Sequence, residues 1–214
     1  MNKHLVIVTS VIKPKLSESF FSGEQRFTQL LETLKCVREK IPLNLIIVLE
    51  GTKYTDIQEK EVRKLCHDIF YVNVDRFDKQ CGEVALIGNF LSSIYFNKLK
   101  KDYKILSMNK ISGRYTLTEN FKFYYDGETC ICKLVKPEES YSGYGHIQTR
   151  YYSIPAKYLD HFASNLFKCF QKIFINIEHT FYLNNVIPLD KINKEIKKIN
   201  VCGNIAPNGD YVED

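Results

Sequence analysis

The sequence predicts an α/β fold, with a doubly wound and mostly parallel sheet flanked by helices, on two observations. First, short apolar runs alternate with longer segments of helical periodicity through the first half of the chain. Such alternation is typical of parallel strands joined by right-handed helical crossovers. Second, the apolar runs are continuous rather than alternating, which indicates strands covered by helices on both faces.

The elements of the first half follow in a regular order. Strands are predicted at residues 4–12, 43–51, 68–75 and 103–109. Helices are predicted between them, at residues 22–41, 55–66 and 82–100. The first two helices begin with capping-box spacings, Ser22 with Gln25 and Thr55 with Gln58.

The second half departs from this rhythm. Four elements are predicted there: an antiparallel edge strand at 128–136, a long Gly-, Ser- and Tyr-rich loop at 137–155, and helices at 158–174 and 177–185. Asn176 is expected to cap the last of these helices. Residues 189–199 place isoleucines on one helical face and lysines on the other. Because no linker or internal repeat occurs, we expect one domain over residues 1–214, divided near residue 125.

Composition restricts the class of protein. Hydrophobic residues make up 44% and charged residues 26%, which argues against disorder. No apolar run approaches the about 18 residues that a membrane span needs, so a soluble protein is expected. Seven cysteines without a C-x-x-C pair argue against a zinc site and favour a reducing compartment, the cytoplasm. The lysines of residues 191–198 suggest a solvated face, with at most a peripheral attraction to anionic membranes.

Polar residues follow the ends of the predicted parallel strands. Ligands of such sheets bind beyond the carboxyl ends of the strands. The residues expected to converge there are Thr9, Ser10, Glu50, Asp75 and the segment from Lys110 to Arg114.

The fourth predicted strand runs into LSMNKISGRY, residues 106–115. Its glycine lets backbone approach a ligand closely, while Lys110 as a point charge and Arg114 as a bidentate donor suit a diphosphate. The alternative is a turn whose two cations are solvated or paired with a carboxylate. Neither a Walker loop nor a dinucleotide-binding fingerprint occurs, which argues against NTPases and dehydrogenases.

Three segments together resemble small bacterial and viral glycosyltransferases of the GT-A superfamily: KISGRY, LVIVTSVI and RFTQLLETLKCVREKIPLNLIIVLEG. The resemblance covers roughly residues 1–125 and implies a first half that binds a nucleotide sugar and a second half that binds an acceptor. It implies these positions for the strand-end residues: Thr9 and Ser10 near the nucleotide, Glu50 and Asp75 near the base or ribose, and Lys110 and Arg114 near the diphosphate or donor sugar.

One departure from the family concerns the metal. Typical members carry Asp-x-Asp at the end of the fourth strand, where it holds Mn²⁺ or Mg²⁺. Here that place reads Ser107 to Lys110, without a carboxylate. Either a cation of the protein replaces the metal, or Mn²⁺ or Mg²⁺ is held by the substrate and by residues elsewhere.

The second half offers candidates for catalysis and acceptor binding. Glu178, in the first turn of a predicted helix, is placed to deprotonate an acceptor hydroxyl or, more simply, to favour the helix dipole. His179 beside it is a candidate contact to diphosphate or metal. In the predicted loop, Tyr144 and Tyr151 offer aromatic faces for an acceptor sugar, although an ordinary mobile loop explains them equally well. Asp210 is a weaker rival for the base.

The expected function is transfer of a sugar from a nucleotide-diphosphate donor, UDP-linked, to a hydroxyl of a glycan or glycoconjugate. The alternative is a nucleotide- or RNA-binding module without transferase activity. The cations of this chain are dispersed rather than striped, which argues against a nucleic-acid partner. A third interpretation is a glycosyltransferase fold that has lost catalysis, and the missing Asp-x-Asp keeps it open.

Overall fold

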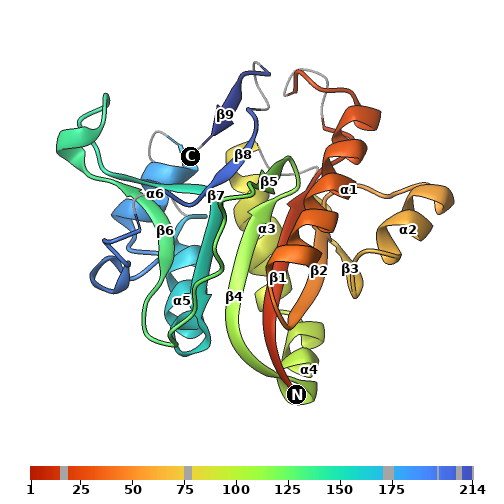
Figure 1. Ribbon diagram of the computed structural model, residues 1–214, viewed down its shortest axis with the longest axis horizontal. Coiled ribbons are helices and arrows are strands. Elements are labelled where there is room, and N and C mark those ends of the chain that lie inside the picture. Colours follow the sequence, from red (N-terminus) through yellow and green to blue (C-terminus); the bar gives the residue numbers. More distant parts are fainter. Residues whose placement is uncertain (15–18, 75–78, 171–175, 197, 206–208, 214) are drawn as a thin grey trace.

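The computed structural model describes residues 1–14, 19–74, 79–170, 176–196, 198–205 and 209–213. Its centre is a six-stranded sheet with the strand order β3-β2-β1-β4-β7-β6 (Figure 1). The strands are β1 (Asn2–Ser10), β2 (Asn44–Glu50), β3 (Asp68–Tyr71), β4 (Lys104–Ser112), β6 (Ile131–Val135) and β7 (His146–Pro155). β1 to β4 are parallel, and β7 and β6 continue the sheet as antiparallel strands. The predicted mostly parallel sheet with an antiparallel edge is therefore confirmed.

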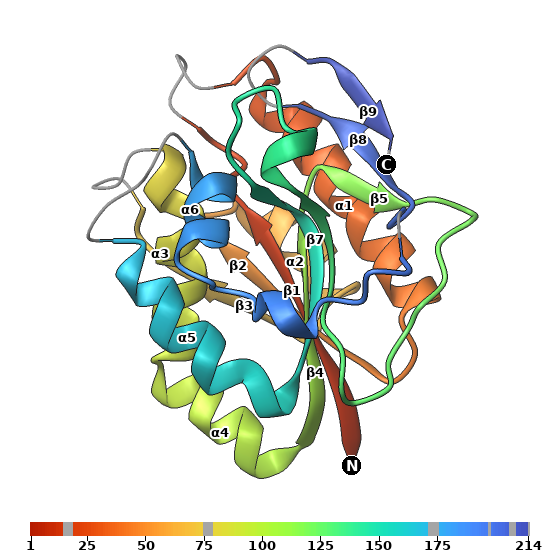
Figure 2. The same cartoon turned by 90° about the vertical axis from the view of Figure 1, so that its left-hand side faces the viewer.

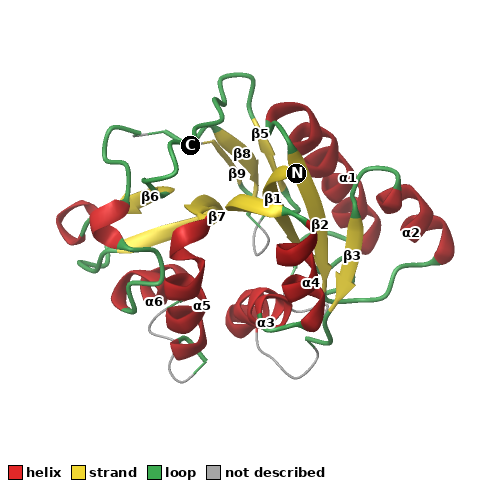
Figure 3. Cartoon of the chain, turned by 90° about the horizontal axis from the view of Figure 1, so that it is seen from below, coloured by secondary structure: helices red, strands yellow, loops and turns green. Residues whose placement is uncertain are grey.

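Helices cover both faces of this sheet (Figure 3). One face carries α1 (Gly23–Lys40) and α2 (Asp56–Arg63); the other carries α3 (Lys79–Leu91), α4 (Ile94–Asp102), α5 (Leu159–Lys168) and α6 (Ile177–Leu183). Successive residues of β1 point to opposite faces, so that Val6 packs in the cluster with Leu34 of α1 and Ile7 in the cluster with Phe90 of α3. This double covering explains why the strands read as continuous apolar runs. Within the described ranges, no helix has the length and apolar character of a membrane span.

The order of the strands reverses between β1 and β4. From β1 the chain passes through β2 to β3, and α3 with α4 then carries it back to β4 on the other side of β1. At this switch point the backbone N–H of Gly113 donates to the Thr9 carbonyl over 2.9 Å. A Cβ at Gly113 would lie 3.0 Å from Leu30 Cδ1, so glycine suits the close approach of the two strand ends. Doubly wound sheets bind ligands at such a point.

Helix boundaries were predicted with mixed success. Both capping boxes are present, and Asn176 caps α6 by accepting the N–H of His179. The helix predicted over 82–100 is divided, because the Ser93 side chain accepts the N–H of Phe96 and begins α4 as a new helix. The helix predicted over 55–66 ends at Arg63, and that predicted over 158–174 is described as α5, with residues 171–175 outside the described part.

Two predictions for the second half were wrong. The expected loop 137–155 contains β7, whose residues are buried on alternate positions from His146 to Arg150 and continuously from Tyr151. The amphipathic segment 189–199 contains a 3₁₀ turn at Leu189–Lys191 but no α-helix among its described residues. Its buried isoleucines Ile192 and Ile199 enter the cores on opposite faces of the sheet, so they do not share one helical face.

A small antiparallel sheet was not predicted. It has the order β5-β8-β9 and consists of β5 (Tyr115–Leu117), β8 (Val201–Asn204) and β9 (Tyr211–Glu213). Figure 2 shows it beside α1, where the hydroxyl of Thr33 donates to the Tyr115 carbonyl over 2.9 Å. The C-terminal tail is therefore tied back to the strand that leaves the switch point.

Candidate functional site

A wide bulge in β7 organises the polar side chains at the carboxyl edge of the parallel strands. Cys132 of β6 pairs with Tyr152, whereas Leu134 pairs with Ile147, so a step of two residues along β6 spans five along β7. Residues 148–151 therefore have no regular pairing with β6, although Tyr151 still pairs with Ile111 of β4. Bulges of this kind re-aim side chains and occur often beside functional sites. Because β7 is antiparallel to β4, its first half lies at the edge where β1 and β4 end.

Lys110 is fully buried beneath this bulge. Its ammonium donates to the Thr149 carbonyl (2.5 Å) and the Ser112 hydroxyl (2.8 Å), and it forms an ion pair with Glu83 of α3 (2.8 Å). These three groups use all three donors of the ammonium. A direct contact between Lys110 and donor phosphates stays a prediction, and the buried position of Lys110 does not favour it. Residues 107–110 lie inside β4, not at its end, and the strand ends at Ser112, followed by a turn with Gly113 and Arg114.

Four charged groups share this neighbourhood. Burial lowers the pKa of Lys110, the carboxylate of Glu83 opposes that effect, and the charges of Arg114 and Glu178 also act on it, in opposite directions. The residues come from β4, the turn after it, α3 and α6. The fold therefore brings Glu178 and Arg114, both predicted from the sequence, to the same edge.

Glu178 is held by the bulge. Its Oε1 accepts the backbone N–H of Thr149 over 3.3 Å, while the carbonyl of Thr149 accepts the Lys110 ammonium. Thr149 therefore links the buried lysine to the first turn of α6. No hydrogen bond joins the other carboxylate oxygen to a described residue, and Glu178 is only partly buried. That oxygen is available to accept a proton.

The imidazole ring of His179 is held by protein groups at both of its nitrogens. Its Nδ1 lies 2.7 Å from the Asn176 side-chain oxygen, its Nε2 lies 3.0 Å from the Ser142 hydroxyl, and its ring lies 5.2 Å from that of His146. Burial and the neighbouring His146 lower the pKa of His179, which favours the neutral ring. Since both nitrogens have protein partners, His179 fastens the β6–β7 hairpin to α6.

Arg114, which the sequence predicts to bind a diphosphate, has an unpaired hydrogen-bond donor. Its Nη1 is buried and has no acceptor among the described residues. The guanidinium carbon lies 5.6 Å from the centroid of the Tyr115 ring. Buried polar groups in native proteins nearly always have partners, so an orphaned guanidinium nitrogen marks a place for a ligand oxygen.

The strand-end residues Thr9 and Ser10 contribute their backbone carbonyls. The Thr9 carbonyl accepts a hydrogen bond from the N–H of Gly113, and the Ser10 carbonyl accepts one from the N–H of Gly51. These bonds connect β1 to the ends of both neighbouring strands. Asp75, predicted to approach the base or ribose, lies outside the described residues.

The carboxylate of Glu50 points into the interior of the protein. Its carboxylate accepts the N–H of Ile12 (3.1 Å), the N–H and hydroxyl of Thr52 (3.0 and 2.8 Å) and the hydroxyl of Tyr54 (2.8 Å). It is fully buried. Burial, together with this carboxylate, raises the pKa of Tyr54, so that its hydroxyl stays a donor. Glu50 therefore holds the loops after β1 and β2 in place.

Replacing Glu50 by glutamine is expected to lower the free energy of unfolding by about 1–3 kcal/mol, because the amide nitrogen cannot accept a hydrogen bond and leaves a buried donor unpaired. Urea denaturation measures the change. Glu59→Gln, which removes a half-exposed ion pair with Arg63, is the control and is expected to change the free energy of unfolding far less than Glu50→Gln. A stable Glu50→Gln protein with weakened nucleotide binding would contradict this structural role.

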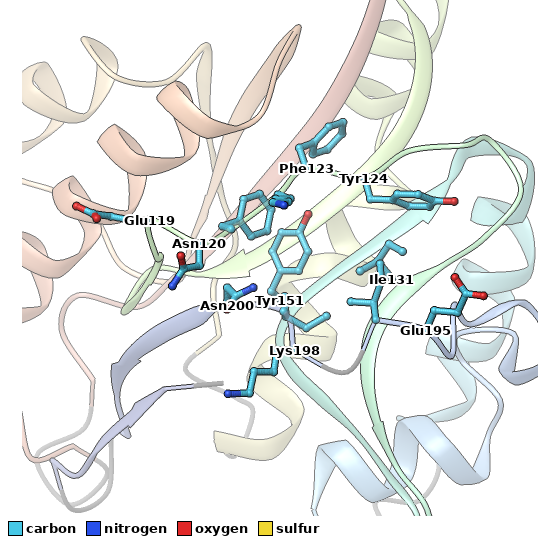
Figure 4. A pocket seen from close by; sticks show the side chains of 13 residues that line it. Glu119, Asn120, Phe123, Tyr124, Ile131, Tyr151, Glu195, Lys198 and Asn200 are labelled. Carbon is cyan, nitrogen blue, oxygen red and sulfur yellow. The ribbon is translucent and has the colours of Figure 1, made fainter.

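The two predicted acceptor-binding tyrosines do not lie together. Tyr144 is 46% exposed in the turn before β7. Tyr151 is a correction to the predicted loop, because it lies in β7, is buried, and donates its hydroxyl to the Asn109 side chain over 3.2 Å. Figure 4 shows Tyr151 at a groove of about 800 Å³ with Phe123 and Ile131. The cluster that contains Tyr151 lies on the α1 face of the sheet, and Glu178 belongs to α6 on the other face.

The metal expected for GT-A enzymes finds no ligand set here. The described residues hold no group of three or more His, Cys, Asp or Glu side chains able to bind a metal ion. At the end of β4 the side chains are the Ser112 hydroxyl, already bonded to Lys110, and the cationic Arg114. Carboxylates suit Mg²⁺ and Mn²⁺, whereas a guanidinium repels them. The end of β4, where the family's aspartates would stand, therefore offers no carboxylate to a divalent cation.

Solved structures with the same architecture are glycosyltransferases. WbbM, a bifunctional glycosyltransferase, matches with a TM-score of 0.53 and 6% identity over 89% of this chain and 38% of its own. Core-mannan synthase A from Aspergillus fumigatus, solved with Mn and GDP, matches with a TM-score of 0.50 and 8% identity over 85% of this chain and 69% of its own. The chain has a glycosyltransferase fold. The mannosyltransferase Ktr4p from S. cerevisiae, in complex with GDP, has a TM-score of 0.49 and 9% identity, and this chain covers 65% of it. No protein-family model and no curated protein matches the sequence.

Within the glycosyltransferase fold, several residues of the site were not predicted. Glu83 sits in α3, and its pairing with Lys110 depends on tertiary packing alone. Thr149 acts through its backbone, which no residue pattern reveals. His146, Gln148 and Arg150 did carry a signal, since polar residues alternate with Ile147, Thr149 and Tyr151 in a strand-like pattern.

Proposed function

We propose that this protein is a glycosyltransferase that uses a nucleotide-diphosphate sugar, UDP-linked, as the donor and a hydroxyl of a glycan or glycoconjugate as the acceptor. The observation that carries the proposal is the orphaned guanidinium nitrogen of Arg114 at the switch point between β1 and β4. A diphosphate supplies the oxygens that this nitrogen lacks. The GDP complex of core-mannan synthase A, a protein with the same fold, supports a nucleotide-diphosphate ligand.

In the proposed reaction, Glu178 acts as the general base. Its Oε2 takes the proton of the acceptor hydroxyl, whose oxygen forms a bond to the anomeric carbon of the donor sugar. The bond from that carbon to the diphosphate oxygen breaks, and the diphosphate leaves with the electron pair. Attack opposite the leaving group inverts the configuration at the anomeric carbon. Arg114 stabilises the charge that grows on the leaving oxygen.

Arg114→Ala is expected to weaken binding of the nucleotide-diphosphate by about 10-fold to 100-fold, because a charge-assisted hydrogen bond to a buried donor is lost. Titration calorimetry with UDP, UDP-glucose, UDP-galactose and the corresponding GDP compounds measures this change, and chromatography of donor and product measures transfer or slow hydrolysis.

Arg38→Ala serves as the matched control. The Arg38 guanidinium donates to the Lys64 carbonyl at the opposite end of the sheet, in the last turn of α1. If no nucleotide sugar binds to the wild-type chain, or if Arg114→Ala binds donors as Arg38→Ala does, the proposed function is wrong.

A further inference from the structure

The first half of β7 carries three polar side chains, His146, Gln148 and Arg150, which are partly buried, whereas Ile147 and Thr149 between them are buried. Ile147 packs in the cluster on the α3 face of the sheet and Tyr151 in the cluster on the α1 face, so the side-chain direction changes within this irregular stretch. None of the three polar side chains was assigned a role from the sequence.

Two of these side chains have an unpaired polar atom. His146 Nδ1 and Gln148 Oε1 are buried and have no hydrogen-bond partner among the described residues, as is true of Arg114 Nη1. Because burying an unpaired polar atom costs about 1–3 kcal/mol, a polar ligand that pairs with such atoms is favoured. His146 also contacts the ring of His179, the residue after Glu178.

Arg114 and Arg150 lie against one aromatic ring. The guanidinium carbons of Arg114 and Arg150 lie 5.6 and 5.7 Å from the centroid of Tyr115, so they are at most about 11 Å apart. Neither arginine forms an ion pair with a carboxylate in the described part of the chain. An anion with several oxygens, such as a diphosphate, is long enough to interact with both guanidinium groups.

We infer that Arg150 is the second phosphate-binding residue of the site and that it clamps the donor diphosphate together with Arg114 over the Tyr115 ring. The inference rests on the proposed function for the identity of the anion. It also explains the poor fit to a metal, since two guanidinium groups supply fixed positive charge where a divalent cation would otherwise be needed.

The irregular stretch of β7 contains both of the groups that the clamp and the base depend on. Arg150 lies there against Tyr115 of β5, and the next residue, Tyr151, pairs with Ile111 of β4. Thr149, which holds Glu178, lies in the same stretch. One irregular stretch therefore carries both the proposed phosphate contact and the residue that holds the proposed base.

The experiment compares Arg150→Gln and Arg150→Lys with the wild-type chain and with the Arg38→Ala control. Calorimetry measures the dissociation constants of UDP, GDP, inorganic pyrophosphate, uridine and guanosine. Arg150→Gln is expected to weaken binding of pyrophosphate and of the nucleoside diphosphate at least 10-fold without affecting the nucleoside. Arg150→Lys is expected to recover only part of the loss, because an ammonium cannot bind two phosphate oxygens as a fork. Thermal unfolding tests that both variants remain folded.

The outcomes separate this inference from the proposed function. If Arg150→Gln binds pyrophosphate and nucleoside diphosphates within twofold of wild type while the wild-type chain transfers sugar, the inference fails and the proposed function stands. If pyrophosphate binding depends on both arginines but no nucleotide sugar binds or reacts, the clamp stands and the proposed function fails. If the wild-type chain binds neither pyrophosphate nor a nucleoside diphosphate, the clamp is refuted as well.

Discussion

Lys110→Ala is expected to lower the free energy of unfolding by about 3–5 kcal/mol, because it leaves a largely buried carboxylate, Glu83, without its partner. The Thr149 carbonyl and the Ser112 hydroxyl lose a donor at the same time. Urea denaturation followed by circular dichroism measures the effect. A loss of this size is a large part of the total stability of an ordinary domain.

The double variant Lys110→Met with Glu83→Gln tests the physical cause. It removes both charges and leaves no unpaired carboxylate, so it is expected to recover most of the lost stability. A Lys110→Ala protein that is stable to within about 1 kcal/mol but binds nucleotide sugars poorly would show that Lys110 contacts the donor after all, as the sequence had suggested.

Glu178→Gln is expected to lower the rate of sugar transfer by about 10²-fold to 10⁴-fold, because the amide cannot accept the proton of the acceptor hydroxyl. Its side-chain oxygen still accepts the N–H of Thr149, so the bulge and the clamp should keep their geometry. The affinity for the nucleotide diphosphate is therefore expected to stay within about twofold of wild type. Transfer rates at saturating donor, together with calorimetry, measure the two quantities separately.

Glu24→Gln is the matched control, since Glu24 also lies in the first turn of a helix, α1, but its side chain is exposed to solvent. If Glu178 only favours the helix dipole, both substitutions should have the same small effect on stability, and transfer should continue. Unchanged transfer in Glu178→Gln would remove Glu178 as the base.

The parallel half of the fold could be predicted because local signals agree with tertiary structure there. β1 and β2 are buried on both faces, so their composition alone marks them, and the capping boxes at Ser22 and Thr55 mark where the helices begin. The carboxyl-edge rule then placed Arg114 and the strand ends of β1 and β4 together without any knowledge of contacts.

The antiparallel half could not be predicted to the same degree, because long-range pairing decides it. β7 contains a bulge that interrupts its alternation at residues 148–151, and a bulge depends on the neighbouring strand. β8 and β9 are short: β8 pairs with β5, which lies over 80 residues earlier in the chain, and β9 pairs with β8. The burial of Lys110 is another tertiary effect, since a lysine at a strand end ordinarily reaches solvent.

The hairpin of β6 and β7 joins the sheet only at its outer edge, through the pairing of β7 with β4. Its outer end carries the fully exposed Tyr141, whereas Gly143 has a φ of +69° that favours glycine and Ser142 bonds to His179. Substitutions at the other exposed positions leave the buried strands β1, β2 and β4 undisturbed, yet they lie a few residues from His146. A selection experiment that randomises residues 138–141 and 144 should therefore yield folded proteins with altered acceptor choice more often than one that randomises the strand ends of β1 or β4. We therefore expect new acceptor preferences to arise more readily through changes in the β6–β7 hairpin than through changes in the buried strands.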